Sequence, residues 1–219
     1  MSKLVWDQTG EKLYETGIEQ VALYHQVDGE YPKGVAWNGV TALNLSPSGA
    51  EPTNLYANNK KYLTLMSLEE LGYTIEAYTY PTEWAECDGS AAVTKGVYLG
   101  QQPRKVFGLV GKTLIGNDEV GTKYGYKLHL LYGSRASVSE KSNATISDSP
   151  EAQTMSWECT TTPVTVPGFE PSSYICINST EVDAEKLKAL EAILYGSEDA
   201  EPRLPLPEEV FTTLGVTAA

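Results

Sequence analysis

The sequence predicts a mainly β protein: an antiparallel β-sandwich or split barrel with one flanking α-helix and extended terminal arms. Residues that favour strands are abundant, including 14 tyrosines among 219 residues. Several stretches alternate apolar and polar side chains between Gly, Asn, Asp or Pro, which is typical of strands with one buried face. Only one stretch combines the apolar spacing and the capping residues of a stable helix.

Strands are predicted in segments whose spacing suits a sandwich or a barrel. In chain order these segments are 19–26, 39–45, 73–80, 104–115, 124–133, 152–164 and 173–180. The alternation is cleanest in 152–164, where Met155, Trp157 and Cys159 point to one face. Segment 124–133 repeats the pattern, with the inward positions occupied by Tyr126, Leu128, Leu130 and Tyr132. Both are predicted as half-buried antiparallel strands.

The helix is predicted over residues 184–195. Asp183 precedes it as N-cap, Gly196 follows it, and one face carries a stripe formed by Leu187, Leu190, Ile193 and Leu194. We expect this helix to pack across a sheet. A weaker helical turn is predicted at 67–72, "SLEELG", because its first and fourth residues have capping-box spacing.

The chain after residue 196 differs from the part before it. The stretch "EPRLPLPEEV" contains three prolines, which predicts an extended segment and then a short helix that starts near Pro207. We therefore predict a β-sandwich domain over 1–196 and a C-terminal arm over 197–219. Residues 1–10 are predicted to form an N-terminal arm.

Composition restricts the possible partners. The 29 acidic and 16 basic residues give a net charge of −13, and the basic residues do not cluster, so tight binding of nucleic acid is not expected. No apolar run approaches the roughly 18 residues of a membrane span, and the N-terminus lacks the order of a secretory signal. We expect a soluble protein of a reducing compartment. Its three cysteines are predicted to be free, buried thiols: Cys87, Cys159 and Cys176.

No catalytic, cofactor-binding or metal site is predicted. His129 falls on the polar face of its strand, and His25 lies at a strand end. For each, a non-catalytic side chain that faces solvent or another subunit is favoured over a catalytic base. Residues 111–113, "GKT", mimic the end of a phosphate-binding loop, but Val106 stands where the first glycine is needed and a strand follows. Segment 116–121 lacks the ligand spacing of a calcium loop and is predicted as a solvated turn.

Carboxylates and tryptophans leave two alternatives open. Glu83, Glu86 and Asp88 could supply the paired carboxylates of a glycosidase, although no feature selects them. Trp37 and Trp84 could stack on sugar rings, although packing in a core or a subunit interface is favoured for each. From the residues alone, the chain is an acidic, mainly β protein without a visible active site.

Several stretches, taken in order, resemble one protein family. They include "GAEPTNLYANN", "EAYTYPTEWAECDG", "GQQPRKVFGLVGKTLIGND" and "LEAILYG" followed by "EPRLPLP". Their order resembles the major tail proteins, or tail tube proteins, of long-tailed bacteriophages of Gram-positive hosts. The resemblance covers nearly the whole chain and contains no catalytic signature.

The resemblance implies a structural virion protein and not an enzyme. Copies would assemble into hexameric rings, and stacked rings would form the tail tube through which DNA is ejected into the host. The implied partners are further copies of the chain and the tape measure, tail terminator and distal tail proteins. Viral DNA would pass through the lumen without specific binding, and this chain would not insert into a membrane. Assembly would occur in the host bacterial cytoplasm.

One loop is expected to make the contacts between copies. The polar segment 46–61 is long for a loop, and loops of this size are usually functional. We expect it to order against a neighbouring subunit or ring, with Trp37 at its base and the terminal arms as second candidates. The acidic charge would prevent DNA from adhering to the lumen. The alternatives are a capsid decoration or head–tail joining protein and a carbohydrate-binding β-sandwich module.

Overall fold

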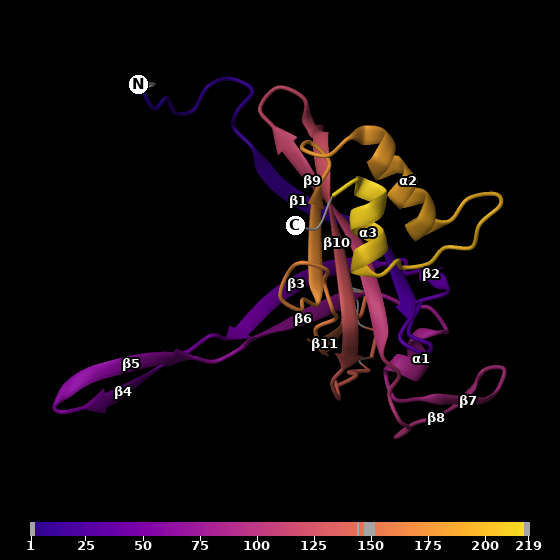
Figure 1. Cartoon of the computed structure of the whole chain (residues 1–219). Helices are drawn as coiled ribbons and strands as arrows, with labels where there is room; N and C mark the ends of the chain where they lie inside the picture. Colours follow the sequence, from indigo (N-terminus) through magenta and orange to yellow (C-terminus); the bar gives the residue numbers. More distant parts are fainter. Residues whose placement is uncertain (1–2, 144, 147–151, 217–219) are drawn as a thin grey trace.

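Strands dominate a computed structural model of the chain, which describes residues 3–143, 145–146 and 152–216 (Figure 1). The strands are β1 (Tyr14–His25), β2 (Gly34–Ala36), β3 (Val40–Gly49), β4 (Pro52–Ala57), β5 (Lys60–Met66), β6 (Glu69–Ala77), β7 (Ala91–Thr94), β8 (Val97–Leu99), β9 (Phe107–Asn117), β10 (Gly121–Ala136), β11 (Met155–Thr161) and β12 (Tyr174–Asn178). The helices are α1 (Trp84–Cys87), α2 (Ala184–Tyr195) and α3 (Pro207–Leu214). The mainly β fold, each predicted strand segment and the flanking helix at 184–195 are confirmed.

An eight-stranded antiparallel sheet forms the body of the described chain: seven strands follow the order β2-β1-β9-β10-β11-β6-β3, and the eighth, β12, pairs with β10. Strand β10, 16 residues long, pairs with β9 along one edge and with β12 and then β11 along the other. The sheet curls so that β3 returns over β9. A Cβ atom on Gly111 of β9 would lie 3.4 Å from Leu43 of β3. The two halves of the sheet thus face each other, as in a sandwich.

Strand β1 carries apolar side chains on both faces because both faces are covered. Val21 and Leu23 enter the inner core between the two halves of the sheet. Ala22 and Tyr24 enter a second core beneath α2 and α3. This double burial accounts for the unbroken apolar run "VALY".

Aromatic rings fill the inner core. The ring centroids of Trp37 and Trp84 lie 4.6 Å apart, and the Trp84 and Trp157 centroids lie 5.4 Å apart. Phe107 meets Trp84 edge to face at 5.0 Å. Helix α1 places Trp84 in this core, and the indole nitrogen of Trp37 donates to the Thr79 carbonyl at 2.8 Å. Trp37 therefore anchors the chain beside the start of β3.

The direction of side chains along β10 changes at Gly133. Leu130 and Tyr132 face the helices, whereas Ala136 faces the inner core, because the pairing with β9 shifts register between Leu131 and Ser134. Gly133 has a φ of +59°, and a Cβ atom there would lie 2.2 Å from the Thr162 carbonyl oxygen. Only glycine fits this bulge.

Helix α2 is held by its cap and by its apolar stripe. The Asp183 side chain accepts hydrogen bonds from the backbone nitrogens of Glu185 and Lys186. Leu187, Leu190 and Leu194 are buried against the sheet. Burial of each leucine contributes roughly 1.5–3 kcal/mol. The Tyr24 hydroxyl of β1 also donates to the Leu194 carbonyl at 2.6 Å.

The C-terminal segment is extended and then helical, and α3 begins at Pro207 as predicted. The segment is nevertheless docked on the body over its described residues. The Arg203 nitrogen donates to the Ile193 carbonyl, and Leu204 and Val210 are buried in the core beneath the helices. The described part of 197–219 therefore differs from the projecting arm that the sequence suggested.

The helical turn predicted at 67–72 is wrong, because this segment enters strand β6. The Ser67 hydroxyl accepts a hydrogen bond from the Glu51 nitrogen at 3.0 Å instead of capping a helix. Strand β6 pairs with β3 on one side and with β11 on the other. Two ladders of backbone hydrogen bonds outweigh a local capping signal.

Candidate assembly surfaces

The segment 46–61, predicted as an irregular loop, is a β-hairpin that projects far from the body (Figure 1). The outer half of β3, which reaches Gly49, pairs with β6, and the hairpin continues through β4 paired with β5. The turn consists of Asn58 and Asn59, both with positive φ, as in a two-residue type I′ turn. From residue 46 to the tip, about 3.3 Å per residue gives a reach of roughly 40 Å.

One face of this hairpin carries exposed leucines. Leu55 lies opposite Leu63, and Thr53 opposite Leu65, so these four side chains share a face. Leu55, Leu63 and Leu65 are 42%, 37% and 54% exposed. We call these three residues the leucine stripe. A lone two-stranded hairpin is marginally stable in water, so an exposed stripe of this kind is typical of a surface that another molecule covers.

The opposite face of the hairpin is mixed. It carries Asn54 and Thr64, whose side chains are joined by a 2.9 Å hydrogen bond, and next to them Met66, which lies opposite Pro52 and is 64% exposed. The tip carries Lys60 and Lys61, a pair of cations on an acidic molecule. The hairpin thus combines a face with three exposed leucines, a mixed face and a basic tip.

Two other exposed apolar surfaces lie apart from this hairpin. The β7–β8 hairpin exposes Val93, Val97, Tyr98 and Leu99. Sequence reasoning missed it, although Gly96, with a φ of +80°, marks its turn. Near the N-terminus, Leu4, Val5 and Trp6 are 72%, 62% and 72% exposed, and this segment leads away from the body (Figure 1).

Unpaired sheet edges remain in the described part of the chain. Strand β3 pairs with β6 alone, and β2 covers β1 only from Ala22 to Tyr24. Residues 14–20 of β1 therefore have a strand on one side only. Two register shifts against β9 interrupt this edge near Gly17 and Gln20, both of which have positive φ. Such bulges reduce pairing with unrelated strands and leave short edges for a specific partner.

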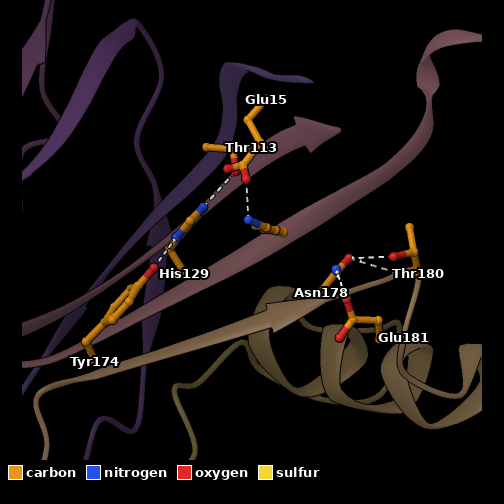
Figure 2. Close-up of polar contacts among 8 residues, drawn as sticks. Glu15, Thr113, His129, Tyr174, Asn178, Thr180 and Glu181 are labelled. Atoms are coloured by element: carbon orange, nitrogen blue, oxygen red, sulfur yellow. Dashed lines mark hydrogen bonds and ion pairs between the residues drawn. The ribbon is translucent and has the colours of Figure 1, made fainter. Parts of the chain in front are cut away.

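A polar cluster lies on the face of β9, β10 and β12 that points away from α2 (Figure 2). At its centre, His129 Nε2 lies 2.7 Å from the Thr113 hydroxyl, and His129 Nδ1 lies 2.7 Å from the Tyr174 hydroxyl. Lys127 forms an ion pair with Glu15 beside them. The histidine therefore joins three strands through side chains.

This geometry favours a structural role for His129 over the role of a catalytic base. Both ring nitrogens are engaged by hydroxyl groups, so neither is free to take a proton from a substrate. Burial lowers the pKa of His129, which keeps the ring neutral near neutral pH. His129, predicted to face solvent or a subunit, is partly buried and contacts Thr113 and Tyr174 within the chain.

The thiols differ in accessibility. Cys87 and Cys159 are buried as predicted, and burial raises the pKa of the Cys87 thiol to about 12. Cys176 is exposed, so the prediction of a buried thiol is wrong there. It lies opposite His129 on β12, at the outer side of the polar cluster.

The carboxylates considered for glycoside chemistry form separate contacts. Glu86 lies 2.6 Å from Lys105 and 3.7 Å from His25, while Asp88 pairs with Lys141. The Glu83 backbone carbonyl, not its carboxylate, contacts the His25 ring. His25 ends β1 as predicted. These contacts link the region of α1 to the end of β1 and to loop residues, and do not form a cleft between two carboxylates.

The tryptophans considered as sugar platforms are core residues. Trp37 is 3% exposed and Trp84 is fully buried. Neither can present a ring face to a ligand, so the core alternative is confirmed for both. Residues 111–113 lie within strand β9, and Asn117 fixes the turn at 116–121 by accepting from the nitrogens of Glu119 and Val120.

Comparisons add no family to this description. No model of a known protein family matches the sequence, and no curated protein resembles it significantly. Within the described residues, no helix is long and apolar enough to cross a membrane. The same residues contain no group of three or more His, Cys, Asp or Glu side chains arranged to hold a metal ion.

Proposed function

We propose that this protein is a structural subunit that self-assembles into stacked, hexameric rings and so forms the tail tube of a long-tailed bacteriophage. The order of its sequence segments resembles that of tail tube proteins, and the fold is of the β-sandwich class that this resemblance implies. DNA would leave the virion through the lumen of the tube. The chain would act in the virion tail, with the tape measure, tail terminator and distal tail proteins as further partners.

The observation that carries this proposal is the leucine stripe on the projecting hairpin. A structure that extends roughly 40 Å into solvent with apolar residues along one face gains little from its own body. It gains from a surface that receives it. A second copy of the same chain supplies such a surface at every position of a ring or a stack.

The unpaired edges of β1 and β3 support the same proposal. Head-to-tail contacts between identical copies form a closed ring when the successive rotations add up to a full turn. A second kind of contact, along the ring axis, can stack such rings without limit. Pairing of the β1 edge with a strand of a neighbour would remove exposed backbone donors and acceptors in each copy. The ring would then have a continuous wall of strands.

The net charge of −13 suits a conduit for DNA. Duplex DNA carries one negative charge per about 1.7 Å of its axis, so a basic lumen would hold it at many points at once. An acidic wall repels the phosphates over a Debye length of about 8–10 Å. The alternative of a carbohydrate-binding module is less well supported, because Trp37 and Trp84, the two rings that could have stacked on sugars, are buried.

Electron microscopy of the concentrated, purified protein tests the proposal. We expect tubes or stacked rings, and sedimentation should show a distribution that grows with protein concentration. Single rings that never stack would favour a head–tail joining protein, and a stable monomer that binds glycans would favour a carbohydrate-binding module. A strictly monomeric protein under every assembly condition would contradict self-assembly.

A further inference from the structure

A hollow of reversed charge lies between the start of α2 and the β9–β10 hairpin. This cavity, of about 570 Å³, is lined by Lys112, Lys123 and Lys188 but by only one carboxylate, that of Glu191. The chain as a whole has 29 acidic and 16 basic residues. Glu191 in the lining and Glu19, which pairs with Lys112, offset part of this charge, and the lysines still leave a net positive charge opposite in sign to that of the whole molecule. We call this cavity the lysine pocket.

Two of the three lysines are available to a ligand. Lys112 lies 4.1 Å from the centre of the Tyr126 ring and 3.5 Å from a carboxylate oxygen of Glu19, so it is engaged within the chain. Lys123 and Lys188 are exposed and form no ion pair among the described residues. Their charges are free to attract an anion.

An acidic turn lies at the other end of the same helix. Residues 197–201 join α2 to the segment before α3, and Glu198, Asp199 and Glu201 are exposed. None of these three carboxylates forms an ion pair within the described chain. We call residues 197–201 the acidic turn.

The acidic turn has a defined shape. The Ser197 nitrogen donates to the Ala200 carbonyl at 3.0 Å, and the Asp199 nitrogen donates to the Ser197 hydroxyl at 3.4 Å. Gly196, with a φ of +83°, allows the chain to leave α2 in this direction. A preformed turn loses little conformational entropy on binding, which favours its use as a docking element.

The lysine pocket and the acidic turn cannot meet within one chain. Helix α2 has 12 residues, so at 1.5 Å per residue its ends lie about 18 Å apart. Contact between them is possible only between copies. A contact that joins two different surfaces of identical subunits is head-to-tail and can be repeated from copy to copy.

We propose that the acidic turn of one copy docks in the lysine pocket of the next copy, with Glu198 and Asp199 facing Lys123 and Lys188. The inference rests on the proposed self-assembly and identifies one of its contacts. The acidic turn is the occupant that fits the lysine pocket by charge. Copies with a net charge of −13 repel each other overall, and the attraction between these two oppositely charged surfaces offsets that repulsion.

Two charge-reversed proteins test this contact. One carries K123E and K188E, and the other carries E198K and D199K. In either protein alone, like charges face each other across the contact. We therefore expect each to assemble only at a protein concentration at least tenfold higher than the wild type needs. An equimolar mixture should assemble like the wild type, because each protein then offers a turn that fits the pocket of the other.

Matched controls carry the same charge changes at other exposed positions: K33E with R135E, and E140K with E170K. We expect these proteins to assemble at wild-type concentrations. Thermal melting of all variants checks that they are folded. Assembly of both reversed proteins alone at wild-type concentrations would overturn the contact, and so would failure of the mixture while the folded controls assemble. Failure of the wild type itself to assemble would instead overturn the proposed function.

Discussion

Replacing the leucine stripe with serine should raise the protein concentration needed for assembly and leave the monomer folded. The variant carries L55S, L63S and L65S, all on the projecting hairpin outside the two cores of the body. Substitutions at exposed sites away from a core usually change the free energy of unfolding by no more than about 0.5 kcal/mol. The melting temperature should therefore stay close to that of the wild type.

The effect on assembly follows from the exposed area of the stripe. The exposed fractions of 42%, 37% and 54% together exceed one whole leucine. Burying that much apolar surface in a partner is worth about 2–4 kcal/mol for each hairpin. Loss of this free energy should raise the concentration needed for assembly by roughly 30- to 700-fold, at 1.4 kcal/mol per factor of ten.

Light scattering across a dilution series measures the concentration at which assembly begins. The matched control is N54S with T64S, which alters the opposite face of the same hairpin and should assemble at the wild-type concentration. Wild-type assembly by the leucine-stripe variant would refute the reasoning. Equal loss in both variants would mean that the hairpin acts without a preferred face.

Three further predictions concern the body of the protein. Burial lowers the pKa of His129 below its ordinary 6.5, so the unfolded state binds more protons at this residue as the pH falls through that value. The wild type should therefore lose stability on acidification. In thermal melts at pH 7.5 and 5.0, H129Q should lose less stability between the two pH values than the wild type does. G133A should destabilise by about 1–3 kcal/mol in urea titrations, because φ is positive and the Thr162 carbonyl is too close, whereas G100A, with open space around it, should be near neutral; equal effects would contradict this. A thiol reagent should label Cys176 alone in the native monomer and all three thiols after unfolding, and rapid native labelling of more than one thiol would contradict the packing.

Patterns of burial explain how much of the fold could be predicted from the sequence. Segments such as 152–164 alternate because one face is buried, and this signal located β11. Strand β10 was located in the same way, although both its faces are covered near Leu130 and Leu131. The helix at 184–195 has a cap, a stripe and a terminal glycine, and these local signals agree with its packing.

The projecting hairpin could not be predicted in this way. Its strands have no buried face in the monomer, so β4 and β5 lack the contrast between apolar and polar faces on which periodicity depends. The useful signal was the pair Asn58 and Asn59, which favours a type I′ turn. At 67–72 a local capping pattern pointed to a helical turn, and long-range strand pairing determined the structure instead.

Candidate site residues were harder to place than strands. The core position of Trp37 and Trp84 follows from the way in which β3 and β6 return over β9, and no local pattern carries that information. The contact of His129 with Tyr174 joins strands 45 residues apart in sequence. The lysine pocket likewise brings together residues from β9, β10 and α2. Only the fold shows these neighbours.

Hydrogen exchange of the hairpin amides tests the central claim most directly, namely that the β4–β5 hairpin is completed by another copy. The protein is labelled with deuterium at a dilution where it is monomeric and again after concentration, and peptides from residues 50–67 are compared with peptides from the body. We predict fast exchange in the dilute hairpin, strong protection after concentration, and little change in the sheet around β9 and β10. Equal exchange of the hairpin in the two samples, in a protein that has assembled, would contradict the account.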